Sequence, residues 1–517
     1  MEKNYLRTVT QGTWWNYLQY VFSIGTSFIL SIVLTRYFAT DVYGVYTYVY
    51  FVVNTVVLTL NFGLTTTLQT FVPPLHFGEQ FEERNATFRQ LLKIQMFIVL
   101  LGLVILLPFV PAWQRVTTFR LDGFGTLIFL GILLSAVNVT INFFATLFSS
   151  LQKFRLLSLV NVVSQLLSFL AALAMVFFNQ QLLFILLVTL TINLSVLVRY
   201  VWLSREMIGG WSNIIRQRVN IRKMLSFSFL AYVNVLLQLV IWDRSEFFFL
   251  GKFQPSDQLA IYGISYTIAL MIVGLIDPIM NVFVSILSEL VGKNDWGRIK
   301  LIVEKGSKYV GIIFLPTITV LLLYGPQLIG SLYGQRFLNV AIIVPWLTLS
   351  ALIARAFIPA WAVTTYKHDL RQIVKIELGV AAFNILLDVI LIPRYGFVGA
   401  AWANCLTQAG AFVALGVYVR KYGLHLFRST FIGIVVVNMA IAGLLILAKA
   451  FLLGWTFHLL FFGTGIAYML LMVKFFLQSD DLLFMQDMQA HGPSTLRPIV
   501  RVGVKLVHRL KGSTNYV

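Results

Sequence analysis

The chain has 517 residues, of which 59% are hydrophobic and 11% charged, and its formal net charge is +19. This composition excludes an ordinary water-soluble globular protein. The positive charge does not indicate nucleic-acid binding, because the basic residues lie in short connections beside apolar runs, where membrane topology and contact with membrane lipids account for them. The single cysteine, Cys405, lies in an apolar run, so we expect neither a disulfide framework nor a metal cluster.

Fourteen long apolar runs fill most of the chain and predict an all-α polytopic membrane protein with fourteen transmembrane helices. A helix needs about 20 residues to cross about 30 Å of hydrocarbon. If the first run begins in the cytoplasm, the inner connections hold most of the Lys and Arg residues, which places both termini in the cytoplasm. In chain order the runs are 13–35, 43–72, 92–112, 123–149, 156–178, 181–203, 224–250, 258–288, 307–331, 340–364, 371–392, 397–419, 430–453 and 455–477.

Two similar segments predict an internal repeat with an offset of six helices. In both segments a basic residue and an aromatic residue precede an Asp, and a Tyr-Gly pair follows: Tyr43-Gly44 in the first and Tyr262-Gly263 in the second. Six is an even number, so we expect two parallel six-helix lobes related by a pseudo-two-fold axis. The predicted divisions are an N-terminal lobe (1–203), a cytoplasmic linker (204–223), a C-terminal lobe (224–425), two additional helices (426–477) and a basic cytoplasmic tail (478–517).

Polar residues recur at helical spacing within several runs. Intervals of three, four or seven residues place each set on one helix face. Because polar groups are costly in hydrocarbon, these faces predict a water-filled cavity, and interhelical hydrogen bonding is the alternative. The predicted cavity-lining residues are Asn16, Gln19, Asn54, Asn61, Gln69, Asn138, Asn142, Asn234, Gln238 and Asn281.

Ionisable residues inside the runs are a sharper signal, since a charge within the bilayer needs a partner or a ligand. Arg355 lies in the tenth run and requires an acidic partner or an anionic ligand, and Arg244 in the seventh is a second, weaker candidate. Asp277, beside a proline, has the chemistry to carry a proton, to bind a cation or to pair with an arginine. Asp243 and Asp388 are the other acidic candidates, and Asp388 also fits a position near the membrane interface.

The segment 391–403, which reads LIPRYGFVGAAWA, resembles the "LIPxxGxxGAAxA" signature of polysaccharide-repeat flippases. These are the Wzx-like members of the MOP exporter superfamily. Arg36 with Tyr43-Gly44, and Asp243-Arg244 with Leu250-Gly251, are similar to further marks of that family. In the seventh run, Phe229-Leu230-Ala231 stands where many members of the family carry a proline. The kink that this proline would cause in helix seven therefore does not follow from the resemblance.

The resemblance implies a transporter without a cofactor that works by alternating access in the cytoplasmic membrane of a bacterium. Its substrate would be a polyprenyl-(pyro)phosphate-linked oligosaccharide, moved from the inner to the outer leaflet for cell-surface or exopolysaccharide assembly. Arg355 and Arg244 suit the phosphate, and the short loops 36–43 and 251–261 would close the outer side. Asp277, Asp243 and Asp388 are the candidates for ion coupling, and nothing in the sequence selects H⁺ over Na⁺.

Three alternatives to this interpretation remain. A drug/cation antiporter of the multidrug extrusion branch shares the superfamily, but we expect it to favour acidic residues over arginine in its cavity. A membrane-embedded glycosyltransferase or polymerase needs acidic catalytic residues in a large outer loop, and the outer loops here are short. A scaffold without transport leaves the buried charges unexplained. We therefore expect no enzymatic activity, and we expect partners to be the lipid-linked substrate, membrane lipids, H⁺ or Na⁺ and other polysaccharide-assembly proteins.

Overall fold

The structure, a computed structural model, is helical throughout the part of the chain that it describes. Among the described residues, ten helices are long and apolar enough to cross a membrane, and two shorter apolar segments, Phe22–Tyr37 and Trp455–Leu471, are also helical. The chain is therefore a multi-pass membrane protein. The described residues are 2–119, 121, 123–178, 181–208, 220–239, 241, 245–277, 280, 283–284, 287, 290–291, 294–366, 370–425, 429–452, 454–472 and 474.

The helices of the first half lie along the predicted runs, and the clearest difference concerns the second run. The run 43–72, expected as one helix, is two helices in the structure, because Phe62 and Gly63 both adopt left-handed backbone angles (φ 48° and 70°). An αR helix cannot continue through such residues. The helices are α1 (Glu2–Tyr37), α2 (Thr40–Asn61), α3 (Leu64–Phe77), α4 (Phe81–Leu106), α5 (Val110–Val116), α6 (Phe124–Ser150), α7 (Phe154–Phe177) and α8 (Leu182–Met207).

In the second half, the longest element is α16, with 50 residues. As a straight helix it would extend about 75 Å, more than twice the hydrocarbon thickness. It bends at Gly396 (φ 56°), between the two runs 371–392 and 397–419. The helices are α9 (Ile221–Gln238), α10 (Ser245–Phe253), α11 (Ser256–Gly274), α13 (Trp296–Leu332), α14 (Val340–Ala356), α15 (Ile358–Tyr366), α16 (Leu370–Val419), α17 (Ser429–Phe451) and α18 (Trp455–Leu471).

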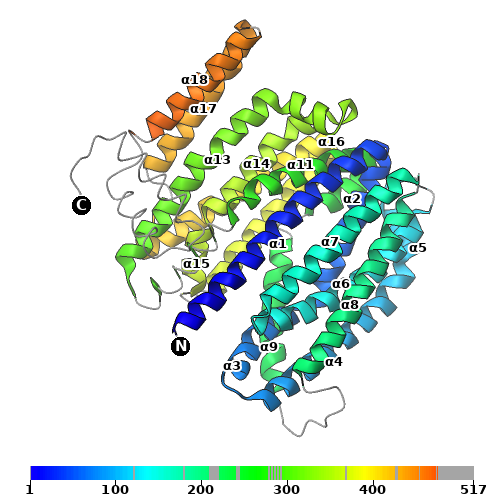
Figure 1. Cartoon of the computed structure of the whole chain (residues 1–517). Coiled ribbons are helices and arrows are strands. Elements are labelled where there is room, and N and C mark those ends of the chain that lie inside the picture. The colour runs from blue at the N-terminus through cyan, green and yellow to red at the C-terminus, as the bar shows by residue number, and fades with distance from the viewer. Residues whose placement is uncertain are drawn as a thin grey trace.

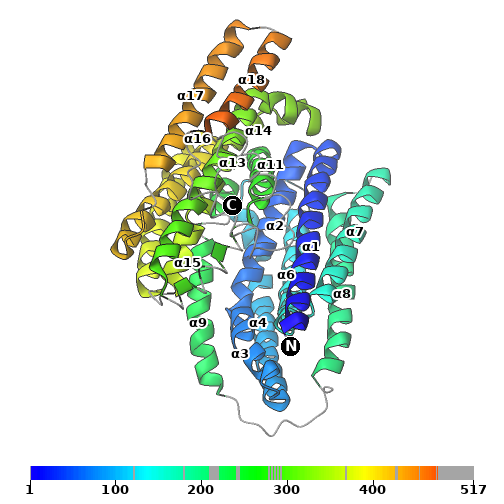
Figure 2. The same ribbon diagram turned by 60° about the vertical axis from the view of Figure 1, so that its left-hand side comes forward.

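Three large apolar clusters hold the helices together. The first joins the two halves of the chain, because it combines Val49 of α2 and Ile128 of α6 with Leu259 of α11 and Val344 of α14. The second lies within the second half. The third lies within the first half, apart from Met224 of α9. Helices α2 and α11 pack against each other in the middle of the molecule (Figures 1 and 2). Helices α17 and α18 form a hairpin at one edge, where α17 packs on α13 (Figure 2).

Candidate functional site

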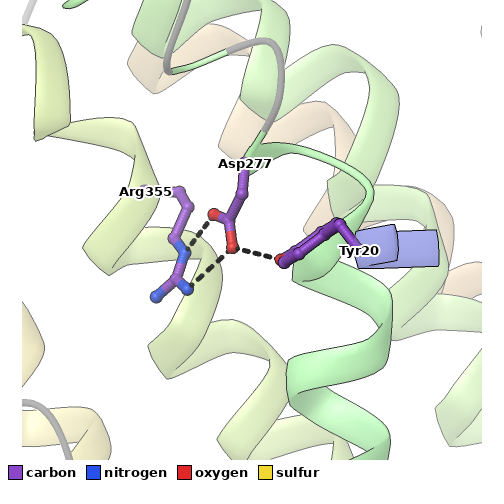
Figure 3. A network of polar contacts seen from close by, with 3 residues as sticks. All are labelled: Tyr20, Asp277 and Arg355. Atoms are coloured by element: carbon purple, nitrogen blue, oxygen red, sulfur yellow. Dashed lines mark hydrogen bonds and ion pairs between the residues drawn. The ribbon is translucent and has the colours of Figure 1, made fainter. Parts of the chain in front are cut away.

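Arg355 and Asp277 form an ion pair inside the helical bundle (Figure 3). Arg355 is in the last turn of α14, where a cation interacts favourably with the helix dipole. Asp277 lies three residues beyond the end of α11. Arg355 Nε donates to Asp277 Oδ1 at 3.0 Å, and Nη2 donates to Oδ2 at 3.3 Å. The sequence left open whether Arg355 takes an acidic partner or an anionic ligand, and in this conformation the partner is Asp277.

Tyr20 of α1 completes this group. Its hydroxyl donates to Asp277 Oδ2 at 2.9 Å. The Asp277 carboxylate therefore accepts hydrogen bonds from two helices that belong to different halves of the chain. The ion pair is also accessible, because the side chains of Arg355 and Asp277 are 24% and 26% exposed.

A pocket of about 100 Å³ lies against Arg355. This volume holds a few water molecules, since each needs at least about 10–15 Å³ of such space. Polar groups in a membrane protein are placed where water or protein can satisfy them, so a pocket with this lining suits water. Its polar lining comes from Arg355, Ser350, Asn404 and Gln408.

Two further carboxyl groups lie deeper in the second half of the chain. Glu246 of α10 is 2% exposed, and its Oε1 accepts a hydrogen bond of 2.7 Å from Asn404 Nδ2. The Asn404 side-chain oxygen in turn accepts a hydrogen bond from the Ser350 hydroxyl. This chain of contacts links Glu246 to the pocket beside Arg355.

Asp388 of α16 is fully buried among the helices of the second half. Its Oδ2 accepts a 2.9 Å hydrogen bond from the Ser245 hydroxyl, and Asn384 donates to the same hydroxyl at 2.6 Å. Thr407 donates to Asn384 at 2.7 Å. Within the described part of the chain, Oδ1 of Asp388 has no hydrogen-bond partner. A carboxyl group buried in this way is stable either in its protonated form or with a cation bound to it.

The predicted cavity-lining residues divide into two groups. Asn54, Gln69 and Asn142 are exposed, whereas Gln19 is half-buried. Asn142 stands out because it is exposed although most of the apolar stretch of its helix, α6, is buried. The others form internal contacts: Asn61 donates to Thr65 at the end of α2, Asn138 accepts from Asn193, and Asn234 donates to Glu377.

Some predicted residues fall outside the part of the chain that the structure describes. They are Arg244, Asp243 and Asn281, together with the linker residues 209–219 and the tail from residue 475. The side chains of Asn16 and Gln238 also fall outside it.

Sequence reasoning missed three residues of this region: Glu246, Glu377 and Tyr20. Both glutamates stand inside apolar runs, so the rule that singled out Asp277 applies equally to them. Glu377 is 6% exposed and contacts Asn234 across helices α16 and α9. Tyr20 gave no signal, because a tyrosine is common in membrane helices and its partner is 257 residues away.

The two predicted loops, 36–43 and 251–261, lie in contacts between distant parts of the chain. Arg36 Nε donates to the carbonyl of Leu332 at 2.9 Å. The Thr118 hydroxyl donates to the carbonyl of Gln254 at 2.7 Å. Glycine of the second Tyr-Gly pair allows close packing here, since a Cβ on Gly263 would lie 2.5 Å from a Thr47 methyl group. Both segments of the repeat therefore lie where α2 packs against α11.

Solved structures with this arrangement of helices are membrane transporters. The chain is similar to the lipid II flippase MurJ in an inward closed conformation (TM-score 0.64, 13% identity, 89% of this chain and 97% of that chain). It is also similar to an inward-facing MATE multidrug resistance transporter of the MOP superfamily (TM-score 0.61, 11% identity, 78% of this chain and 95% of that chain). For a mutant of the Vibrio cholerae MATE transporter VcmN, the TM-score is 0.57 and the identity 13%, over 80% of this chain and 97% of that chain. At these low identities, the TM-scores show only that the chain has the fold of MurJ and the MATE transporters.

The family is established by sequence. A family model described as "Polysaccharide biosynthesis protein" matches residues 33–342, more than half of the chain. The chain therefore belongs to this family of polysaccharide biosynthesis proteins. A comparison of the sequence with curated proteins found no match.

Proposed function

We propose that this protein is a flippase that moves a polyprenyl-(pyro)phosphate-linked oligosaccharide from the inner to the outer leaflet of a bacterial cytoplasmic membrane. Membership of the polysaccharide biosynthesis family and the fold shared with a lipid II flippase support this assignment. The observation that carries it is Arg355, an accessible guanidinium within the bundle at a pocket that suits water. A guanidinium binds phosphate oxygens in the same forked geometry in which it binds a carboxylate.

The proposed architecture is two six-helix lobes, 1–203 and 224–425, joined by the cytoplasmic linker 204–223. Residues 426–477 would add two helices to give fourteen crossings, and 478–517 would form a cytoplasmic tail. The basic inner connections support cytoplasmic termini. The repeat segments at the α2–α11 contact support the pseudo-two-fold relationship.

The proposed cavity between the lobes is lined by amide side chains. The exposed residues Asn54, Gln69 and Asn142 are the strongest candidates, since amides suit sugar hydroxyls and are costly against acyl chains. Asn138 and Asn234 are weaker candidates because both already bond to other helices. Arg244 remains a second proposed phosphate ligand on the sequence alone.

Ion coupling is proposed at the buried carboxyl groups of the second half. Asp388, with an oxygen that has no described partner, suits a bound H⁺ or Na⁺ better than Asp277, whose charge Arg355 neutralises. Asp243 is retained as a candidate from the sequence. The contact chain through Glu246, Asn404 and Ser350 offers a physical connection between this region and the pocket at Arg355.

A flipping assay in proteoliposomes, with a fluorescent polyprenyl-pyrophosphate oligosaccharide, tests the proposal. Arg355→Ala should slow flipping by about tenfold or more, since a charge-assisted contact is worth about 1.5–3 kcal/mol. Arg355→Lys should retain part of the rate, because it keeps the charge and loses the fork. The double variant Arg355→Gln/Asp277→Asn removes both charges without leaving either unpaired, and it should be as slow as Arg355→Ala.

The second candidate, a drug/cation antiporter, shares the fold of the MATE structures. The same proteoliposomes distinguish the two. Cation-driven uptake of a lipophilic cationic dye, with no movement of the lipid-linked glycan, would replace the flippase assignment with an antiporter.

A further inference from the structure

The hydrogen bond from Tyr20 to Asp277 lies where α1 meets the end of α11, and the two helices approach closely there. A Cβ on Gly274, the last residue of α11, would lie 2.6 Å from the Ile24 side chain and 3.2 Å from the Tyr20 hydroxyl oxygen. The absence of a side chain at Gly274 therefore lets α1 lie against α11. The Tyr20 hydroxyl uses this proximity to reach the carboxylate at 2.9 Å.

Asp277 also occupies the part of Arg355 that would bind a phosphate. Its two oxygens accept from Nε and Nη2, which form one edge of the guanidinium fork. A phosphate bound side-on would use the same pair of donors. The carboxylate and a phosphate are thus competitors for one anion site, and both cannot bind this edge at once.

We propose that Asp277 holds the anion site of Arg355 in the empty transporter, and that a pyrophosphate headgroup displaces it. This inference rests on the proposed function. Displacement swings the carboxylate away from Arg355 and breaks its hydrogen bond with Tyr20, which releases α1 from the end of α11. Binding of the substrate phosphate and separation of these two helices are then one event.

Charge balance favours this exchange over simple rupture of the ion pair. Arg355 stays neutralised throughout, because one anion replaces another before the guanidinium is left alone in the bundle. The released carboxylate is 26% exposed while paired, so water has access to it. A pyrophosphate carries more charge and more acceptor oxygens than one carboxylate, which gives it the advantage at the shared site.

The coupling also discriminates against neutral ligands. A ligand changes a conformational equilibrium only by its difference in affinity for the two states. A sugar without a phosphate cannot take the place of Asp277 and leaves the Tyr20 contact intact. The Asp277 carboxylate therefore makes the opening of the α1–α11 contact depend on the phosphate group.

The test measures binding of geranyl pyrophosphate, a soluble short-chain polyprenyl pyrophosphate, to the full chain. The protein is placed in phosphatidylcholine nanodiscs, so that no anionic lipid headgroup competes. Asp277→Asn should bind at least about tenfold more tightly than the natural chain, because the competing anion is gone. Tyr20→Phe should bind more tightly by a smaller factor, because the carboxylate loses one of its anchors.

A matched control separates this effect from general loosening of α1. Tyr333→Phe removes another hydrogen bond of α1, the 3.0 Å contact with Ser31, and should leave the affinity unchanged. Inorganic pyrophosphate, added as a competitor, should displace geranyl pyrophosphate if the phosphate group alone fills the site. Failure to compete would assign binding to the prenyl chain and overturn the proposal.

A second measurement uses the natural Asp277 and Tyr20 residues. Spin labels at Phe22→Cys and Leu275→Cys, in a Cys405→Ser background, report the separation of α1 from the end of α11. Both positions are exposed. Geranyl pyrophosphate should lengthen this distance, and geraniol, which lacks phosphate, should not.

The outcomes separate the inference from the proposed function. If Asp277→Asn binds no better than the natural chain, or saturating ligand leaves the spin-label distance unchanged, the displacement by phosphate is wrong. Loss of binding in Arg355→Gln/Asp277→Asn would then still support the phosphate site. If that double variant binds as well as Asp277→Asn, Arg355 is not the phosphate ligand and both proposals fail.

Discussion

Gly44 of α2 and Ser256 of α11 are in backbone contact: a Cβ placed on Gly44 would lie 1.7 Å from the carbonyl oxygen of Ser256. Backbone atoms cannot rotate away as a side chain does, so this crossing requires glycine. Small residues allow the same close approach in membrane helices generally. The contact lies between the two repeat segments and holds them together.

Gly44→Ala should therefore weaken the contact between α2 and α11. Overpacking costs about 1–3 kcal/mol, which exceeds the gain of about 1 kcal/mol from replacing a helical glycine by alanine. We expect a lower thermal unfolding temperature and slower glycan export. Gly379→Ala is the matched control, because no atom lies within 4 Å of a Cβ there, and it should be neutral or stabilising. Equal effects of the two substitutions would contradict the backbone contact.

A water-filled cavity predicts a pattern of thiol accessibility. With Cys405 replaced by serine, Asn142→Cys and Asn54→Cys should react with a membrane-impermeant maleimide from one side of the membrane. Leu100→Cys on α4 is the control. Its side chain is 63% exposed, but we expect it to face acyl chains and to stay unlabelled. Labelling of Leu100→Cys as fast as Asn142→Cys would mean that exposure here does not distinguish water from lipid.

Asp388→Asn tests the ion site. Asparagine can still accept the hydrogen bond from Ser245 but carries no charge, so the fold should be retained. We expect export to lose its dependence on an imposed H⁺ or Na⁺ gradient. The exposed Glu82→Gln at the start of α4 is the control and should leave that dependence unchanged. Persistence of the gradient dependence in Asp388→Asn would exclude this carboxyl group from coupling.

Hydropathy located the apolar helices that the structure describes but not their interruptions. The break at Phe62 and Gly63 depends on the sign of two φ angles, which apolar character does not report. Helix α13 begins at Trp296, well before the run 307–331. Hydropathy did not reveal this start, because the first turns of the helix carry charged residues. Both differences arise from local backbone preference rather than from transfer into lipid.

The candidate site was predictable as a set of residues and not as a set of contacts. Intramembrane charge identified Arg355 and Asp277 separately. Their pairing depends on how α14 and the end of α11 are rotated about their axes, over a separation of 78 residues. The Tyr20 hydrogen bond depends in addition on the packing of α1 beside α11. Neither rotation is encoded in the periodicity of a single helix.

His76, at the end of α3 in the connection 73–91, predicts a pH effect on stability. Arg84 Nη1 lies 2.9 Å from His76 Nδ1, and since a guanidinium only donates, the imidazole accepts and is neutral. Burial, together with the charges of Arg84 and Lys153, lowers the pKa of His76 below its usual 6.5. A group with a lowered pKa that is neutral when bonded stabilises the fold above its unfolded pKa. That contribution is lost as the pH falls through the folded value.

We therefore expect the unfolding temperature of the purified protein to decrease when the pH is lowered from 7 to 5, partly because imidazolium would face the guanidinium of Arg84. His76→Gln keeps a side-chain acceptor and does not titrate, so its decrease over the same interval should be smaller. The comparison is made by fluorescence-monitored unfolding at constant ionic strength, because the repulsion between His76 and Arg84 is screened by salt. Parallel pH profiles for the two proteins would show that His76 does not titrate against Arg84 in this range.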